Sequence, residues 1–202
     1  MKREGLIMII SAPSGAGKTT LCRELRKRYP HLSESISYTT RAPRSGEVHG
    51  EDYFFVSRDE FQAMVAADAF AEWAEVHGNL YGTALATLEE ARRNGIDLLL
   101  DIDCQGAMKL KECLDGGVFV FILPPDMAEL RRRLEKRSSD APDVIERRIT
   151  RAAEEIRECR WYDYIIINDR FELALDEISA IVLAQGRRTF RMMEQVAKLF
   201  DI

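Results

Sequence analysis

The chain has 202 residues, of which 46% are apolar and 31% charged, and its formal net charge is −5 at pH 7. This length fits one domain with a real core, and the mild negative charge argues against a surface that wraps nucleic acid. No apolar run approaches the roughly 20 residues of a membrane span, and the N-terminal run is too short for a secretory signal. The four cysteines, like the three histidines, lack the spacing of a zinc site and are typical of reduced thiols. We therefore expect a cytoplasmic protein that binds neither nucleic acid nor a membrane; its oligomeric state is not readable from these numbers.

Short apolar runs bounded by turn residues recur along the chain and predict strands buried in a parallel sheet. They are residues 6–10 (LIMII), 97–102 (DLLLDI), 118–123 (VFVFIL) and 164–168 (YIIIN). Helical patterns lie between them, at residues 19–28, 85–94, 107–114 and 128–137. Strands that alternate with helices predict an α/β fold, a doubly wound parallel sheet with right-handed crossovers.

Two stretches interrupt this alternation. Residues 35–40, 52–56 and 69–76 read as shorter strands, and a capping box at Ser57 and Glu60 opens a helix among them. This pattern predicts a small, partly antiparallel lobe inserted into the main fold. Residues 131–160 are highly charged and helical, which predicts a helical lid. The predicted division of the single domain 1–202 is a core (1–33, 84–126 and 161–202), a lobe (34–83) and a lid (127–160), with hinged closure. The tail 185–202 reads either as a packed helix or as a partner face.

The stretch SAPSGAGKTT, residues 11–20, nearly fits the phosphate-loop pattern G-x-x-x-x-G-K-[ST], with Ala12 in the first place. Glycines let the backbone turn tightly, so that N–H groups converge on an anion at the start of the following helix. Lys18 would reach the β- and γ-phosphates, and the Thr19 hydroxyl would bind Mg²⁺. The alternative is an ordinary glycine-rich turn, but the flanking strand and helix are those that a nucleotide-phosphate site requires.

Asp101 and Asp103 end the apolar run 97–102, at the sheet edge where ligands gather. Either carboxylate could hold Mg²⁺ through water or contact a substrate. Asp103 could equally cap the helix that follows it.

The inserted lobe carries a second cluster of polar residues. It consists of Ser37, Arg41, Arg44, Glu47, Tyr53, Glu72, Tyr81 and Thr83. Two arginines and two tyrosine hydroxyls suit a terminal phosphate, since guanidinium binds phosphate in a bidentate manner. The alternative is that Arg41 and Arg44 are solvated loop charges.

Seven segments in order resemble the guanylate kinases, nucleoside monophosphate kinases of the P-loop NTPase fold. They are SAPSGAGKTT, TTRAPRSGEVHGEDYFF, FAEWAEVHGNLYGT, LLLDIDCQGA, FILPP, RRLEKR and DYIIIND. The resemblance implies reversible transfer of the ATP γ-phosphoryl group to GMP or dGMP with Mg²⁺, giving ADP and GDP in purine nucleotide metabolism. It also implies a lobe that binds GMP: guanine meets Ser37, Glu72, Thr83 and Asp101, and the GMP phosphate meets Arg41, Arg44, Tyr53 and Tyr81. Glu47 belongs to the same GMP-binding set. ATP would contact Ala12, Pro13, Ser14, Gly15, Ala16, Gly17, Lys18, Thr19, Thr20, Arg133, Arg137, Arg148 and Asn168. The catalytic set would be Lys18, Arg41, Arg44, Arg137 and Arg148.

The chemistry of guanine agrees with these residue types. Guanine N1 and N2 donate to a carboxylate such as Glu72, while hydroxyls such as Ser37 and Thr83 donate to O6. Adenine would leave those groups unpaired, which can reduce its use by roughly 10⁴-fold. A surface position for Glu72 is the alternative.

The acceptor that the resemblance implies is a phosphate oxygen of GMP, which is already mostly ionised at pH 7 because the second pKa of a phosphomonoester is about 6. No general base is therefore needed, and the cations offset the repulsion between two polyanions.

Arg131 and Arg132 fit a solvated helix face. Lys136 and Ser138 stand where glycines often flank the lid arginine of the family, so the contact of Arg137 is less defined. Two other function classes stay open: a protein-binding module without catalysis, and a kinase for another phosphorylated acceptor such as a sugar bisphosphate.

Overall fold

The computed structural model describes residues 3–76, 78–136 and 141–201. Its main sheet is parallel and has the strand order β2-β7-β1-β8-β9. The strands are β1 (Ile7–Ser11), β2 (Leu32–Glu34), β7 (Asp97–Asp101), β8 (Val118–Leu123) and β9 (Tyr164–Ile167). The predicted doubly wound α/β fold is confirmed. Strand β2 was not predicted, because only one of its three residues is buried and no apolar run marks it.

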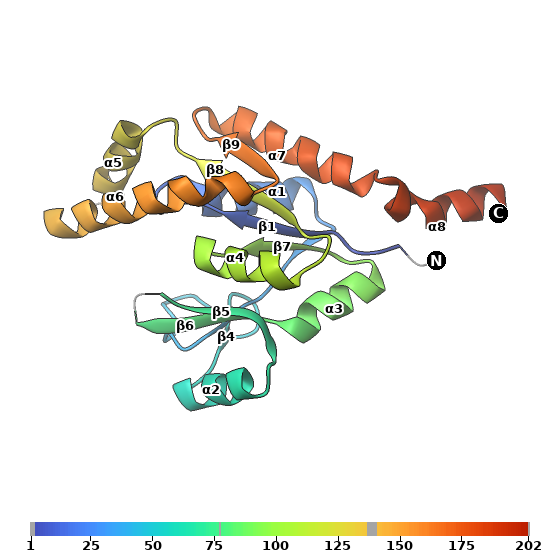
Figure 1. Ribbon diagram of the computed structural model, residues 1–202, viewed down its shortest axis with the longest axis horizontal. Coiled ribbons are helices and arrows are strands. Elements are labelled where there is room, and N and C mark those ends of the chain that lie inside the picture. Colours follow the sequence, from blue (N-terminus) through green and yellow to red (C-terminus); the bar gives the residue numbers. More distant parts are fainter. Residues whose placement is uncertain (1–2, 77, 137–140, 202) are drawn as a thin grey trace.

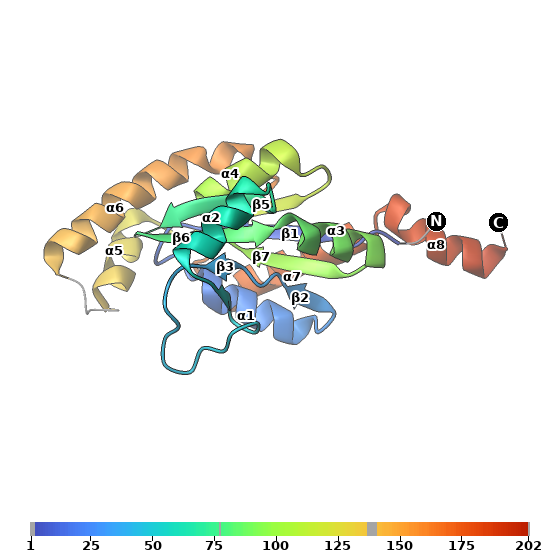
Figure 2. The same cartoon turned by 90° about the horizontal axis from the view of Figure 1, so that it is seen from below.

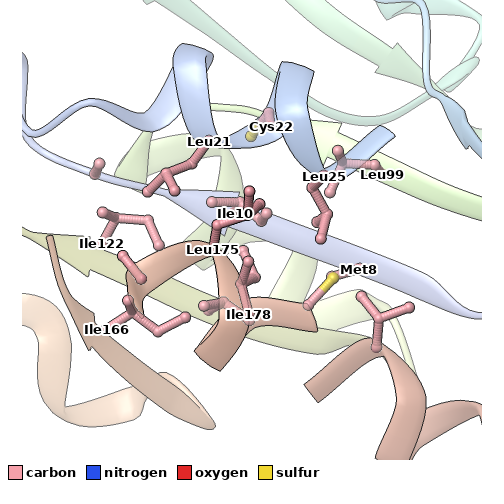
Figure 3. Packing of buried hydrophobic residues seen from close by; sticks show 14 of the residues in the cluster. Met8, Ile10, Leu21, Cys22, Leu25, Leu99, Ile122, Ile166, Leu175 and Ile178 are labelled. Carbon is pink, nitrogen blue, oxygen red and sulfur yellow. The ribbon is translucent and has the colours of Figure 1, made fainter. Parts of the chain in front are cut away.

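Helices cover both faces of this sheet (Figure 2). They include α1 (Lys18–Arg28) and α7 (Phe171–Gly186) on one face, and α3 (Leu85–Asn94) and α4 (Cys104–Cys113) on the other. Alternate residues of β1 point to opposite faces, as the pleat of a strand requires. Met8 and Ile10 therefore pack toward α1 and α7 (Figure 3), while Ile7 and Ile9 join the other cluster. Both faces of β1 are buried, so packing on both sides fixes the position at which the following loop begins.

A second, four-stranded sheet forms the predicted lobe and lies to one side of the main sheet (Figure 1). Its order is β4-β3-β6-β5, with one parallel and two antiparallel pairings. Its elements are β3 (Tyr38–Thr39), β4 (Phe54–Phe55), α2 (Arg58–Ala66), β5 (Phe70–Val76) and β6 (Asn79–Ala84). The capping box at the start of α2 is confirmed: Ser57 Oγ accepts from the Glu60 N–H, and the Glu60 carboxylate accepts from the Ser57 N–H.

The charged stretch is helical, as predicted, and lies at one end of the molecule (Figure 1). It comprises α5 (Met127–Lys136), α6 (Pro142–Arg157) and the short 3-10 helix η1 (Glu158–Trp161). The first two pack on each other through an apolar cluster of Leu130, Leu134, Ile145 and Ala152.

Helix α4 begins at Cys104, three residues before the predicted start, because Asp103 caps it: the Asp103 carboxylate accepts from the Gly106 N–H at 2.8 Å. The tail forms α8 (Thr189–Phe200), which lies at the end of the molecule opposite α5 and α6 (Figure 1). In α8, Arg191 is buried, whereas Phe190, Met193, Leu199 and Phe200 are exposed. Within the described ranges, no helix is long and apolar enough to span a membrane.

Candidate active site

The predicted phosphate loop, residues 12–17, joins the buried strand β1 to the start of α1. Gly15 and Gly17 both have φ of 95°, a backbone conformation that favours glycine. A Cβ on Gly17 would also lie 2.4 Å from Asn168 Nδ2. The loop leads directly into the N-terminus of α1, where unpaired backbone N–H groups and the helix dipole favour an anion.

Lys18 lies in the first turn of α1 and points toward the end of β7. Its Nζ donates to the Ile102 carbonyl at 2.7 Å and lies 2.5 Å from Asp101 Oδ1. Burial disfavours the charge of Lys18, but the charge and hydrogen bond of Asp101 outweigh it, so the pKa of Lys18 is raised and the ammonium persists. Asp101 is therefore the counter-ion of the loop lysine in this structure.

A cavity of about 240 Å³ lies against the phosphate loop. Besides loop residues and Thr19, its lining includes Val76, Asp103, Arg148, Arg151 and Glu155. Three cations, Lys18, Arg148 and Arg151, thus line the same space as the loop. These cations favour a polyphosphate there, and the carboxylates of Asp103 and Glu155 in the same lining oppose them in part.

A second cavity, of about 510 Å³, lies on the other flank of the loop and is lined by Gly15, Gly17, Thr20, Arg133, Lys136, Asn168, Asp169 and Phe171. Asn168 Nδ2 donates to the Ala16 carbonyl at 2.8 Å, and Arg133 Nη2 donates to the Asn168 carbonyl at 3.0 Å. Glu129 in turn holds Arg133 through Nε at 2.7 Å. Arg133 and Asn168 therefore stabilise the phosphate loop through hydrogen bonds and line the cavity beside it.

The third cavity, of about 160 Å³, lies between the lobe and the end of β7. Its lining brings together five of the residues predicted from the lobe and β7: Ser37, Tyr53, Glu72, Tyr81 and Asp101. Val76 and Asp103 line both this cavity and the one against the phosphate loop. The cavity of the lobe and the cavity of the phosphate loop are therefore adjacent.

Glu72 on β5 is only 6% exposed, which is inconsistent with the alternative of a surface carboxylate. Burial raises the pKa of Glu72 to about 7, against the opposing effect of the hydrogen bond from Thr83. That bond runs from Thr83 Oγ1 to Glu72 Oε1 at 2.7 Å, and Thr83 is fully buried. In this structure the Thr83 hydroxyl thus orients the carboxylate, and its predicted contact with guanine O6 stays a prediction.

Arg41 is held by Glu47 through two hydrogen bonds, from Nη1 to Oε2 at 3.0 Å and from Nη2 to Oε1 at 2.9 Å. Glu47 also accepts from the backbone N–H of Arg44 at 2.7 Å. These bonds, with that of Arg41 the strongest, keep the pKa of Glu47 below its usual value. The Arg41 guanidinium carbon lies 5.4 Å from the ring centroid of Tyr53, so Arg41 lies beside the lobe cavity; Arg44 is exposed on the same loop.

Asp103 takes the capping role that was left open. Its Oδ1 caps α4, while its Oδ2 is buried without a hydrogen-bond partner. The predicted residue Arg137 lies outside the described residues. Arg151 and Glu155 were not predicted, although their positions three and seven residues after Arg148 place all three on one helix face, a spacing that could have revealed them.

A parallel sheet with a glycine-rich loop after its central strand, next to a lobe with its own pocket, is the architecture of a P-loop phosphotransferase. The family model described as guanylate kinase matches residues 4–185. Proteins named guanylate kinase from Geobacter metallireducens and Geobacter sulfurreducens are 64% and 61% identical to the chain, over the whole of both chains. A crystal structure of guanylate kinase from Anaplasma phagocytophilum is 37% identical, has a TM-score of 0.77, and aligns over 100% of this chain and 98% of that one. The chain belongs to the guanylate kinase family.

Proposed function

We propose that the protein transfers the γ-phosphoryl group of ATP to GMP, and also to dGMP, and that it does so reversibly. The observation that carries this proposal is the pair of neighbouring cavities, one lined by the phosphate loop and the other by Glu72, Ser37 and two tyrosines. The names of the relatives and the match to the family model support guanine as the base.

In the proposed reaction, an ionised phosphate oxygen of GMP forms a bond to the γ-phosphorus. The bond between that phosphorus and the bridging oxygen breaks, and its electron pair stays on ADP. Lys18, Arg148 and the lobe arginine Arg41 stabilise the charge on the moving group, and Arg44 and Arg137 complete the proposed catalytic set. Arg133 and Asn168 flank the adenosine of ATP, as their shared cavity beside the loop suggests.

Mg²⁺ is the proposed cofactor, and the residues present fit it, because Mg²⁺ prefers oxygen ligands and keeps several waters. The Thr19 hydroxyl and the unpartnered Oδ2 of Asp103 belong to residues that line the loop cavity. Among the described residues, no group of three or more His, Cys, Asp or Glu could hold a metal alone, so the phosphates would supply much of the coordination. The ion would neutralise phosphate charge there.

We further propose a reducing, cytoplasmic setting, because Cys22, Cys104, Cys113 and Cys159 are all free thiols.

The test of the phosphate loop is Lys18→Ala. We expect kcat to fall by roughly 10²- to 10³-fold, as for the loss of one charge-stabilising donor, while the far-UV spectrum and Tm stay near those of the native protein. Lys27→Ala, an exposed lysine of the same helix that pairs with Glu24, is the matched control and should leave kcat unchanged. A near-normal kcat for Lys18→Ala would exclude the proposed role of the loop.

A further inference from the structure

Arg151 lines the loop cavity but has no role in the proposed reaction. Helix α6 presents Arg148, Arg151 and Glu155 to the cavity that contains the phosphate loop. Spacings of three and four residues put these side chains on one face of the helix, above one another. Arg151 therefore lies opposite the loop, in the cavity that adjoins the pocket of the lobe.

Arg151 is held by a carboxylate from its own helix. Its Nε donates to Glu155 Oε1 at 3.0 Å, and the Arg151 side chain is 39% exposed while that of Glu155 is 18% exposed. The same helix carries a second pair with the same spacing, Arg147 and Asp143, whose side chains are 74% and 71% exposed. Arg147 does not line the cavity. The two ion pairs therefore have the same spacing along the helix, and of the two only the pair of Arg151 and Glu155 lies at the cavity.

Glu155 lies close to the phosphate loop. Burial raises its pKa, Arg151 lowers it, and smaller effects come from the charges of Asp103 and Lys18. A carboxylate at this place repels a polyphosphate. In the structure it accepts the hydrogen bond from Arg151 Nε, and this bond restricts the direction of the guanidinium.

We propose that Arg151 is a further catalytic residue, which binds a phosphoryl oxygen between the loop and the lobe, and that Glu155 is its positioning residue. The inference rests on the proposed function, because it takes the loop cavity as the place of phosphoryl transfer. Arg151 adds one guanidinium to the cations that neutralise the two nucleotides, and its planar fork matches the oxygens of a phosphate.

The experiment measures kcat and both KM values, with ATP and GMP, for Arg151→Gln, Arg151→Lys, Glu155→Gln and the double variant Arg151→Gln/Glu155→Gln. Arg147→Gln is the control for loss of one charge from the same helix. We expect kcat to fall at least tenfold in Arg151→Gln, to recover in part in Arg151→Lys, and to match the native value in Arg147→Gln. Tm measurements establish that the variants are folded.

Positioning predicts a non-additive pair. Glu155→Gln should lower kcat in the native background but have no further effect beside Arg151→Gln. An equal fall in both backgrounds would overturn the positioning role, and a kcat of Arg151→Gln within twofold of Arg147→Gln would overturn the catalytic one. Lys18→Ala separates a failure of this inference from a failure of the proposed function. If Lys18→Ala is inactive while Arg151→Gln has native activity, only the role of Arg151 is excluded. Native activity in both variants would exclude the phosphate site itself.

Discussion

At the scale of single residues, Glu72 carries the most specific chemistry. A carboxylate must be ionised to accept hydrogen bonds from guanine N1 and N2, yet burial raises the pKa of Glu72 to about 7. Guanine would supply the two donors that replace lost water, so GMP binding should lower this pKa. If Glu72 binds guanine as proposed, the affinity for GMP near neutral pH depends on the protonation of this one buried side chain.

This gives a prediction on pH. Below about pH 7 Glu72 is protonated in the free protein, so KM for GMP should rise by up to about tenfold per pH unit, whereas KM for ATP should not follow. The measurement is KM for both substrates from pH 5.5 to pH 8.5. Because the GMP phosphate also titrates near pH 6, Glu72→Gln is needed as a control: it should raise KM overall and keep only the lower inflection. A KM for GMP that is flat from pH 6 to pH 8, or the same profile in Glu72→Gln, would contradict the role of Glu72.

The sequence singled out many of the residues that line the loop cavity and the lobe cavity, but not the state of each side chain. The spacing in SAPSGAGKTT was sufficient to predict Lys18 at a helix start, because that motif is local. The pairing of Glu47 with Arg41 and the bond from Thr83 to Glu72 depend on how loops and strands meet, which no local pattern encodes.

At the scale of elements, strands with both faces buried were predictable, because each is a short apolar run that turn residues bound on both sides. Helix α7 was missed: its buried positions follow a helical period, but exposed Leu173 and Leu183 blur the pattern. The start of α4 was also missed, because Gly106 is a poor helix residue and the cap at Asp103 could not be distinguished from a ligand.

Gly106 gives the prediction at this scale. Replacing glycine by alanine inside a helix usually stabilises it, yet a Cβ here would lie 2.5 Å from Glu72 Oε2. The first turn of α4 approaches the carboxylate too closely for a side chain, so Gly106→Ala should displace Glu72. We expect KM for GMP to rise about tenfold, the cost of roughly one lost hydrogen bond, with KM for ATP unchanged.

Gly186→Ala is the matched control, because a Cβ at Gly186, in the last turn of α7, would meet no atom within 4 Å. It should leave both KM values unaltered. Equal KM values for GMP in Gly106→Ala and in the native protein would show that Glu72 does not depend on α4.

At the scale of the whole molecule, a chain of net charge −5 concentrates cations where two polyanions would meet. The lobe (34–83) and the lid (127–160) would close on the core (1–33, 84–126 and 161–202), a division that stays our proposal. Closure would bring the arginines of the lobe and the lid to the phosphates and exclude water, the competing acceptor. The overall composition and the net charge of the chain alone did not predict where these cations gather.

The most direct test of the account is a coupled assay of ADP release with GMP, dGMP, AMP, UMP and ribose phosphates as acceptors. Rapid turnover is predicted with GMP and dGMP, and turnover with AMP lower by roughly 10⁴-fold, because adenine leaves Glu72 and its neighbours unpaired. Comparable turnover with AMP or with a sugar phosphate, or no turnover with any acceptor, would contradict a pocket built to select guanine beside a phosphate loop.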